Sequence, residues 1–278
     1  MKRRRLFCLA PAAFVSCRKK DEVTVWKGIH MGIEVTVSYR GKGDLEPALE
    51  KVREAEAALT LWDQNSPLSQ LNRTGSLAKP PRYLLNCLAK ARELFEASDG
   101  LFDPTIHSYL EWTRAEYQAG RVPDEAVARA KRELVNFARL EIRPELITLP
   151  KGMALSLNAI AQGYLTDVFA EAFECSSALV NFGEYRVIGA QSWPVEVAGR
   201  THPLPLTRAL AVSSGSGQRL SATASANHLI DPSTGKSPPP EMVFAVEADE
   251  AWLADGLATL VAIGGEIPAR YTGVAEVV

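Results

Sequence analysis

The sequence is poor in cysteine, in excess charge of either sign and in long apolar runs. It has 4 cysteines in 278 residues and no C-x-x-C pair, which excludes a disulfide framework and a paired-cysteine metal site. Its formal net charge is only -2, with no basic stripe interleaved with aromatics, so no nucleic-acid partner is expected. No apolar run reaches about 18 residues, which excludes a permanent membrane-spanning helix. What remains, at 46% hydrophobic residues, suits one large enzyme domain with a substantial core.

The first residues have the layout of an export signal. The basic run 2–5 precedes the apolar stretch 6–16, which is too short for a stable transmembrane helix. Residues 4–7 also fit a twin-arginine signal, and residues 14–17, Phe-Val-Ser-Cys, resemble a lipobox whose cysteine is lipidated. A disordered basic tail is the alternative.

We therefore expect residues 1–20 to be an export or lipoprotein signal and tether, and residues 21–278 to form the enzyme domain. The expected location is the periplasmic side of a bacterial inner membrane, with membrane contact through a lipid on Cys17.

Hydrophobic periodicity predicts a mixture of strands and helices. Alternating β-branched residues predict a strand pair over 23–39, and further strands are predicted over 140–149, 178–189, 194–199 and 209–213. Helical spacing predicts helices over 45–60, 83–97, 160–174 and 249–263. The polar stretch 62–81 is expected to be an ordered surface loop, and the charged stretch 109–139 a solvated helical insert without chemistry. This irregular order predicts an α+β (mixed α/β) fold in a single large domain.

The helix predicted over 249–263 carries a carboxylate and a hydroxyl one turn apart. Asp255 and Thr259 have i, i+4 spacing, so their oxygens point to the same side. Such a pair suits Mg²⁺, which prefers one or two protein oxygens and takes its other ligands from water and substrate phosphates. The alternative is an Asp that stabilises a helix N-terminus and a surface Thr.

A histidine beside a rigid turn adds a second functional group. In residues 228–235, His-Leu-Ile-Asp-Pro-Ser-Thr-Gly, His228 precedes a turn of fixed geometry. A neutral imidazole accepts a hydroxyl proton near pH 7, so His228 is a candidate general base, and a structural histidine is the alternative. Residues 100–105, Gly-Leu-Phe-Asp-Pro-Thr, form another rigid segment, whose apolar pair and carboxylate suit the face and edge of a flat ring.

These segments have the order and spacing of the ApbE family, the FAD:protein FMN transferases. Met31-Gly32 resembles the family's early Met-Gly-Thr, and residues 61–72 its aromatic-then-Ser-x-x-Ser-x-x-Asn stretch. Residues 100–105 are similar to Gly-x-Phe-Asp-Pro-Thr, and residues 154–167 to the Asp-Leu-Gly-Gly-Ile-Ala-Lys-Gly-Tyr-x-x-Asp block. The two closing motifs of the family resemble residues 228–235 and 254–259. Six matches in order are far more specific than any one of them.

The resemblance implies an enzyme that transfers FMN from FAD to a Thr or Ser hydroxyl of another protein and releases AMP. It implies FAD as substrate, Mg²⁺ as cofactor, and a membrane or periplasmic redox subunit as the flavin acceptor. By position, Asp255, Thr259 and the main-chain carbonyl of Ala159 are implied as metal ligands, and His228 as the residue that activates the acceptor. The residues implied to line the FAD pocket are Met31, Trp62, Leu101, Phe102, Asp103, Ser156, Gln162 and Leu229.

The match departs from the family pattern around this implied pocket. Ser156, Asn158-Ala159 and Gln162 stand where the family block has Asp, Gly-Gly and Lys. Residues 181–185, Asn-Phe-Gly-Glu-Tyr, replace Asn-x-Gly-Gly-Asp, so Glu184 takes the place of a glycine in a tight turn. Two other functions stay open: an FAD pyrophosphatase, in which water replaces the acceptor hydroxyl, and a flavin-binding lipoprotein without catalysis.

Overall fold

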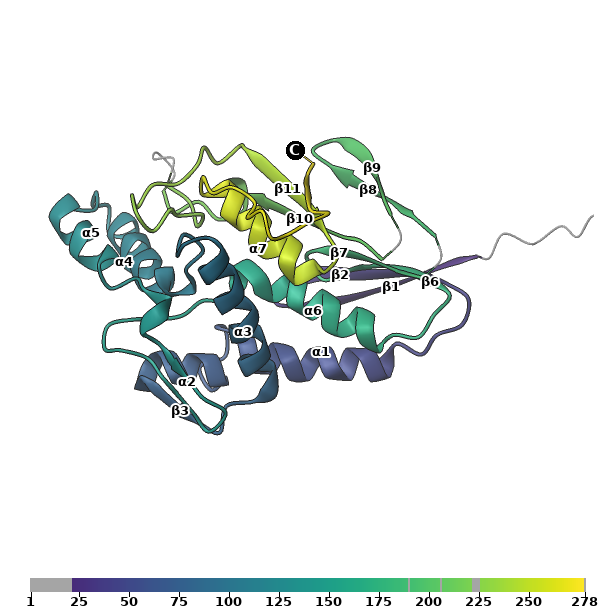
Figure 1. The fold of residues 1–278 in the computed structure, drawn as a ribbon, viewed down its shortest axis with the longest axis horizontal. Coiled ribbons are helices and arrows are strands. Elements are labelled where there is room, and N and C mark those ends of the chain that lie inside the picture. The colour runs from purple at the N-terminus through teal and green to yellow at the C-terminus, as the bar shows by residue number, and fades with distance from the viewer. Residues whose placement is uncertain (1–21, 190, 206, 222–225, 278) are drawn as a thin grey trace, which may run out of the picture.

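The computed structural model describes residues 22–189, 191–205, 207–221 and 226–277, and it confirms the predicted α+β fold (Figure 1). The signal and tether predicted for residues 1–20 lie outside the described residues. The helices are α1 (Glu46–Leu59), α2 (Pro67–Thr74), α3 (Arg82–Ala97), α4 (His107–Gln118), α5 (Glu125–Arg132), α6 (Asn158–Ala172) and α7 (Ala251–Ala262). The strands are β1 (Val23–His30), β2 (Ile33–Arg40), β3 (Ser76–Ala78), β4 (Glu141–Ile142), β5 (Leu146–Thr148), β6 (Ser177–Asn181), β7 (Tyr185–Gly189), β8 (Trp193–Val197), β9 (Arg200–Leu204), β10 (Ala209–Ser214), β11 (Val243–Ala248) and β12 (Ala275–Glu276).

The centre of the molecule is a seven-stranded sheet with the order β1-β2-β6-β7-β10-β11-β12, in which neighbouring strands are antiparallel. The β1–β2 hairpin turns through Met31 and Gly32, which both have positive φ, 50° and 76°. Two-residue hairpins favour this conformation because its twist matches that of the strands. Glu56 of α1 holds the turn, since its carboxylate accepts the Met31 N–H at 2.6 Å and contacts His30 Nδ1 at 2.6 Å.

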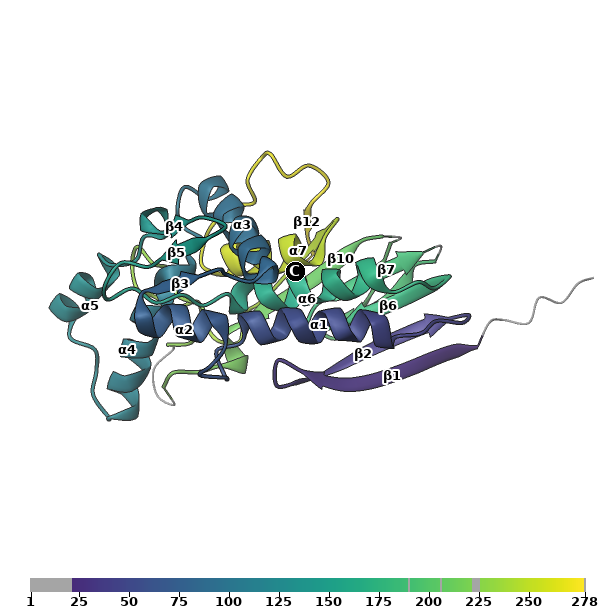
Figure 2. The ribbon, with the colours of Figure 1, turned by 90° about the horizontal axis from the view of Figure 1, so that it is seen from below.

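Side chains alternate between two hydrophobic layers on the faces of this sheet. On β10, Ala209 and Ala211 face the main core with α1, α6 and α7, whereas Leu210 faces the opposite side. That side carries a smaller core, which the β8–β9 hairpin covers with Trp193 and Val195. Figure 2 shows the helical layer lying along the sheet. The period-2 alternation of buried residues therefore fixes the strand register on both faces.

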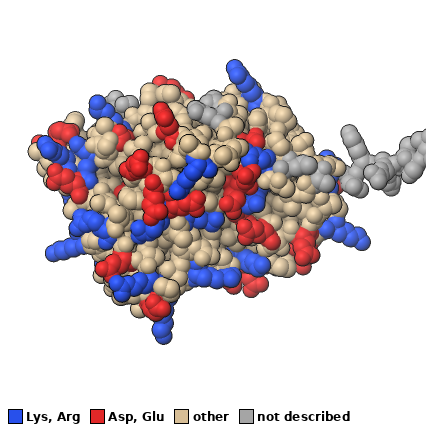
Figure 3. Space-filling view, viewed as in Figure 1, with Lys and Arg blue, Asp and Glu red and all other residues tan. Residues whose placement is uncertain are grey.

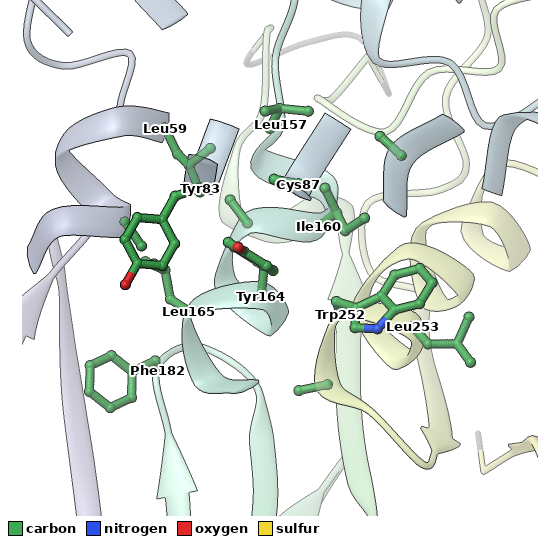
Figure 4. Packing of buried hydrophobic residues seen from close by; sticks show 14 of the residues in the cluster. Leu59, Tyr83, Cys87, Leu157, Ile160, Tyr164, Leu165, Phe182, Trp252 and Leu253 are labelled. Carbon is green, nitrogen blue, oxygen red and sulfur yellow. The ribbon is translucent and has the colours of Figure 1, made fainter. Parts of the chain in front are cut away.

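In the main core, α6 lies between α1, α3 and α7 (Figure 4). Leu165 of α6 is fully buried, as are Leu59 of α1 and Cys87 of α3, and Trp252 of α7 is 3% exposed. Because α6 and α7 are apolar on nearly all sides, both are interior helices rather than amphipathic surface helices.

Helices α6 and α7 lie in backbone contact. A Cβ on Gly163 would lie 2.2 Å from the carbonyl oxygen of Ala251. Asp167, which is 3% exposed, accepts the N–H groups of Ala251 and Trp252 at 2.9 Å, so it caps the N-terminus of α7, and it also pairs with Arg186. The position of α7 relative to α6 is therefore closely fixed.

We expect Gly163→Ala to lower the free energy of unfolding by about 1–3 kcal/mol, the usual cost of overpacking. Alanine has the better helix propensity by about 1 kcal/mol, but the overlap is with backbone atoms, which cannot rotate away. Urea unfolding followed by circular dichroism measures the change. Gly217→Ala is the matched control, because a Cβ at Gly217 meets nothing within 4 Å. Equal stability of the two variants would show that the helices separate at little cost.

Residues 60–155 form a second region beside the helical layer, with the three-stranded sheet β3-β5-β4 and helices α2 to α5. The helical insert predicted over 109–139 is confirmed as α4 and α5, which project from one end (Figure 1). The surface loop predicted over 62–81 is wrong in part, because it contains α2 and β3. Ser66 begins α2 by accepting the Ser69 N–H at 3.0 Å, and Pro67 occupies its first turn.

The strand predicted over 178–189 is also wrong in part, because it is the hairpin β6–β7. Gly183, with φ 106°, makes its turn, and Glu184 has no positive φ. Gly183 therefore takes the left-handed conformation, and Glu184 does not have to adopt it although it stands where the family motif has a glycine.

The surface has a mixed charge distribution, with acidic and basic side chains interspersed over the face in Figure 3. Among the described residues, no helix has the length and apolarity needed to cross a membrane.

Candidate functional site

A cavity of about 500 Å³ opens at the end of the central sheet where the β1–β2 and β6–β7 turns lie. This volume is typical of sites for small molecules and cofactors. All twelve positions predicted from the sequence line it: Met31, Trp62, Leu101, Phe102, Asp103, Ser156, Ala159, Gln162, His228, Leu229, Asp255 and Thr259. The structure therefore brings together residues from six separate segments of the chain.

One wall of the cavity contains the buried Asp255 of α7. Its carboxylate is 4% exposed, and Oδ2 accepts the Gly163 N–H at 3.0 Å. Thr259, one helical turn later, lines the same cavity, and its Oγ1 lies 3.5 Å from Ser213 Oγ. The i, i+4 spacing thus places a carboxylate and a hydroxyl on one wall, as the sequence predicts.

A second buried carboxylate, that of Glu184, lies in the same wall. It is 5% exposed, and its Oε2 accepts the Val212 N–H at 3.0 Å. Burial raises the pKa of Asp255 to about 7, and the negative charge of Asp167 adds to the shift. Burial also raises the pKa of Glu184, and Asp255 raises it further. A cation in the cavity would favour the ionised form of both groups.

The oxygen atoms of this wall fit a small, hard divalent cation. Asp255 and Glu184 offer carboxylate oxygens, Thr259 a hydroxyl and Ala159 a main-chain carbonyl at the start of α6. Magnesium takes one or two carboxylates and completes its shell with water and phosphate oxygens. No group of three His, Cys, Asp or Glu side chains that could hold a metal ion occurs among the described residues.

His228 faces the cavity from the loop after an isolated bridge between Arg219 and Asn227, rather than from the end of a strand. Its backbone N–H donates to the Gln218 carbonyl at 3.1 Å. The Nδ1 atom is buried and has no hydrogen-bond partner among the described residues. Burial lowers the pKa of His228, and the positive charge of Arg114 lowers it further. The imidazole is therefore neutral at pH 7 and able to accept a proton.

Apolar residues at the opening of the cavity suit a planar ring. Trp62 is 78% exposed at the rim, and Met31 lies in the β1–β2 turn. Leu101 and Leu229 also line the cavity, whereas Phe102 is only 2% exposed and belongs mainly to the core. An exposed tryptophan beside a cavity provides a face on which an aromatic ligand can stack.

Asp103 has its oxygens occupied by the chain itself. Oδ1 accepts the Thr105 N–H at 2.8 Å and the Thr105 hydroxyl at 2.5 Å, and Oδ2 accepts the Phe137 N–H at 2.9 Å. The carboxylate thus holds the segment after α3 against the segment before β4. Its contact with the edge of a ring stays a prediction.

The serine and asparagine motif of residues 66–72 is hydrogen-bonded to the segment that leads into α6. Asn72 clamps Leu155, donating to its carbonyl at 2.8 Å and accepting its N–H at 2.7 Å. The next residue, Ser156, lies in the cavity, donates its backbone N–H to Pro104 and accepts the Asn158 N–H at 3.3 Å. Gln162 packs on the β6–β7 turn, since a Cβ on Gly183 would lie 2.7 Å from its Cδ.

Several cavity residues were not identified from the sequence. Val212 and Ser213 of β10 line it, but an ordinary strand pattern carries no signal of this position. Leu110 lines it from α4, although the helical insert was expected to take no part in the site. Glu184 was noted only as an unusual turn residue, and its place in the cavity near Asp255 depends on packing that local sequence does not encode.

Comparisons with known proteins agree with this geometry. A family model described as the ApbE family matches residues 31–272. The apo crystal structure of Pseudomonas stutzeri flavinyl transferase ApbE has a TM-score of 0.73 at 24% identity, with 87% of this chain and 85% of that chain covered. The flavin transferase ApbE of Vibrio cholerae has a TM-score of 0.71 at 20% identity, with 93% and 94% covered. The ApbE protein of Thermotoga maritima has a TM-score of 0.73 at 18% identity, with 87% of each chain covered. The search of curated proteins gave no match. These structural likenesses establish the shared fold.

Proposed function

The chain belongs to the ApbE family and is a transferase enzyme, and we propose a reaction from this premise. We propose that it transfers the FMN half of FAD to a Thr or Ser hydroxyl of an acceptor protein, with Mg²⁺ as cofactor. One observation carries the proposal: Asp255, Thr259 and His228 line a single cavity although they come from distant segments of the chain. Oxygen atoms that can hold a cation and a neutral imidazole that can accept a proton are two groups that assist phosphoryl transfer to a hydroxyl.

The cavity positions the substrate through two different surfaces. The apolar rim with Trp62, Met31 and Leu101 suits the isoalloxazine or adenine ring of FAD. The wall with Asp255 and Thr259 suits the end at which the pyrophosphate is held. Asp255, Thr259 and the carbonyl of Ala159 would hold the cation, and when bound it offsets the charge on the phosphate oxygens. The carbonyl of Ala159 has two lone pairs and so is able to face a cation while it remains in α6.

His228 removes the proton from the acceptor hydroxyl. The bond from the acceptor oxygen to the FMN phosphorus forms while the bond from that phosphorus to the bridging oxygen breaks. AMP leaves with the bonding electron pair, and the hydroxyl proton passes to the imidazole of His228. The product is a phosphoester between FMN and the acceptor, and the flavin undergoes no redox change.

The direct test is incubation of the purified full chain with FAD, Mg²⁺ and a candidate acceptor domain that exposes a Thr. Intact-mass spectrometry is expected to show the acceptor heavier by one FMN less one water, with one AMP released for each adduct. Free FMN and AMP in the absence of acceptor would favour the pyrophosphatase alternative. Retention of FAD without any turnover, against several acceptors, would favour a flavin-binding protein without catalysis.

We also propose that the enzyme works on the periplasmic side of the inner membrane and is anchored by a lipid on Cys17. The order of basic run, apolar run and cysteine in the sequence supports this location. In a bacterial host, Cys17→Ser is expected to abolish incorporation of labelled fatty acid and to release the protein from the membrane fraction. A Cys17→Ser variant that remains membrane-bound and labelled would contradict the lipid anchor. Cys175→Ser is the matched control and should keep both the label and the membrane location.

A further inference from the structure

We propose that Glu184 is an additional ligand of the cation site, so that the free enzyme binds Mg²⁺ or Mn²⁺ before any FAD is present. The inference rests on the proposed function for the place of the cation, but it concerns a residue that stands where the resembling motif has glycine. The argument comes from the position of the side chain, its hydrogen bonds and the charges around it.

The fold aims the Glu184 side chain into the cavity and holds it there. Gly183 takes the positive φ of 106° in the β6–β7 turn, so Glu184 keeps an ordinary backbone conformation. Its carbonyl accepts the Thr166 hydroxyl at 3.2 Å, and its Oε2 accepts the Val212 N–H at 3.0 Å. A carboxylate held through one oxygen is pre-organised to offer the other to a ligand.

The second oxygen of this carboxylate has no partner. Oε1 of Glu184 accepts no hydrogen bond within the described parts of the chain, although the residue is only 5% exposed and lines the cavity. Since this oxygen is not one of the fully buried side-chain atoms that lack a partner, it is open to the cavity and available to a ligand there.

The two carboxylates also lack a positive partner. Among the described residues, no Lys, Arg or His forms an ion pair with Glu184 or Asp255, because the neighbouring Arg186 pairs with Asp167. Both carboxylates are more than nine-tenths buried in one wall. Ionising both buried carboxyl groups without a cation is costly, and a divalent ion held by both would compensate the two charges.

The atoms of the wall then define the kind of ion. Glu184 and Asp255 supply charged oxygens and Thr259 a neutral one, a set that suits hard cations such as Mg²⁺ and Mn²⁺. With one carboxylate, a cation would depend on the phosphates of FAD for charge compensation. With two, the protein alone balances the charge of the ion, so the cation binds first and the pyrophosphate second.

The test is a titration of Mn²⁺ into the full chain without FAD, followed by the electron paramagnetic resonance signal of free Mn²⁺. We expect one bound Mn²⁺ in the wild-type enzyme, which Mg²⁺ displaces. Glu184→Gln is expected to weaken binding by about tenfold or more, because it removes the charge but keeps an oxygen for the Val212 N–H. Glu54→Gln on the exposed face of α1 is the matched control and should bind as the wild type does.

A second variant covers the case in which Glu184→Gln does not fold. Glu184→Gly, which restores the residue of the resembling motif, is expected to bind Mn²⁺ only when FAD is added. Wild-type affinity in the folded glutamine or glycine variant would overturn the proposal, and so would a wild-type enzyme that binds no Mn²⁺ without FAD.

The result is independent of the flavin-transfer assay. Labelled acceptor together with unchanged Mn²⁺ binding in the variants would refute the role of Glu184 and leave the proposed function in place. The opposite result is weakened Mn²⁺ binding in the variants, as expected, but no labelled acceptor from the wild-type enzyme. It would support the cation site and count against the proposed function.

Discussion

Asp255→Asn is expected to reduce the rate of flavin transfer by about 10³-fold, because a bound metal ion supplies several kcal/mol of charge stabilisation to the reaction. Asparagine has the shape of aspartate and retains an oxygen for the Gly163 N–H, which Asp255 accepts at 3.0 Å. The substitution therefore removes the charge that would hold the cation and leaves the contact between α6 and α7. Initial rates of FMN adduct formation, measured by mass spectrometry at one fixed Mg²⁺ concentration, give the ratio.

The fold of this variant should survive, since loss of a buried charge removes a desolvation cost. A melting temperature equal to that of the wild type would confirm that the lost activity is local. Asp44→Asn is the matched control: Asp44 accepts the Glu46 N–H at 3.1 Å on the exposed surface, far from the cavity lining. Full transfer activity in Asp255→Asn would remove the basis of the proposed metal wall.

His228→Asn is expected to lower kcat by about 10²–10⁴-fold, the usual contribution of a general base. Burial lowers the pKa of His228 from its ordinary value near 6.5, so the neutral imidazole is the favoured form at pH 7. The wild-type rate should therefore fall on the acid side only below about pH 6.5, where the base becomes protonated. The variant should lack this acid limb.

The pH profile must be measured at saturating Mg²⁺, so that protons do not compete for the carboxylate of Asp255, whose pKa is raised to about 7. His202→Asn is the control, since His202 contacts Glu247 at 3.0 Å in the β8–β9 hairpin and does not line the cavity. If His228→Asn keeps the wild-type rate and the same acid limb, another group is the base and His228 is structural.

The site was predictable from sequence where its geometry is local. The relation between Asp255 and Thr259 follows from one helical turn, and α7 itself follows from a continuous apolar pattern. The Met31-Gly32 motif likewise lies within a single hairpin, the predicted strand pair. Such features need no knowledge of how distant segments pack, and the motifs that contain them all reach the same cavity.

Features that depend on packing between distant segments were not predictable. Nothing near Glu184 in the sequence indicates that its carboxylate lies beside Asp255, because this depends on how the β6–β7 hairpin packs against α6, which in turn packs against α7. The helix α2 was missed because its apolar face is only Leu68 and Leu71, and turn-forming residues surround it. In both cases the decisive interaction joins segments that are far apart in the chain or too short to show a period.

The burial of α7 has a consequence for how the protein is made. This helix follows every other helix of the described chain, yet it supplies both part of the main core and Asp255, a buried carboxylate of the cavity. During synthesis, a nascent chain that ends before residue 251 would expose the apolar surfaces of α3 and α6 that α7 covers. Emergence of α7 would complete the hydrophobic core and bring Asp255 to the cavity in the same step, so a chain that ends before α7 would lack both.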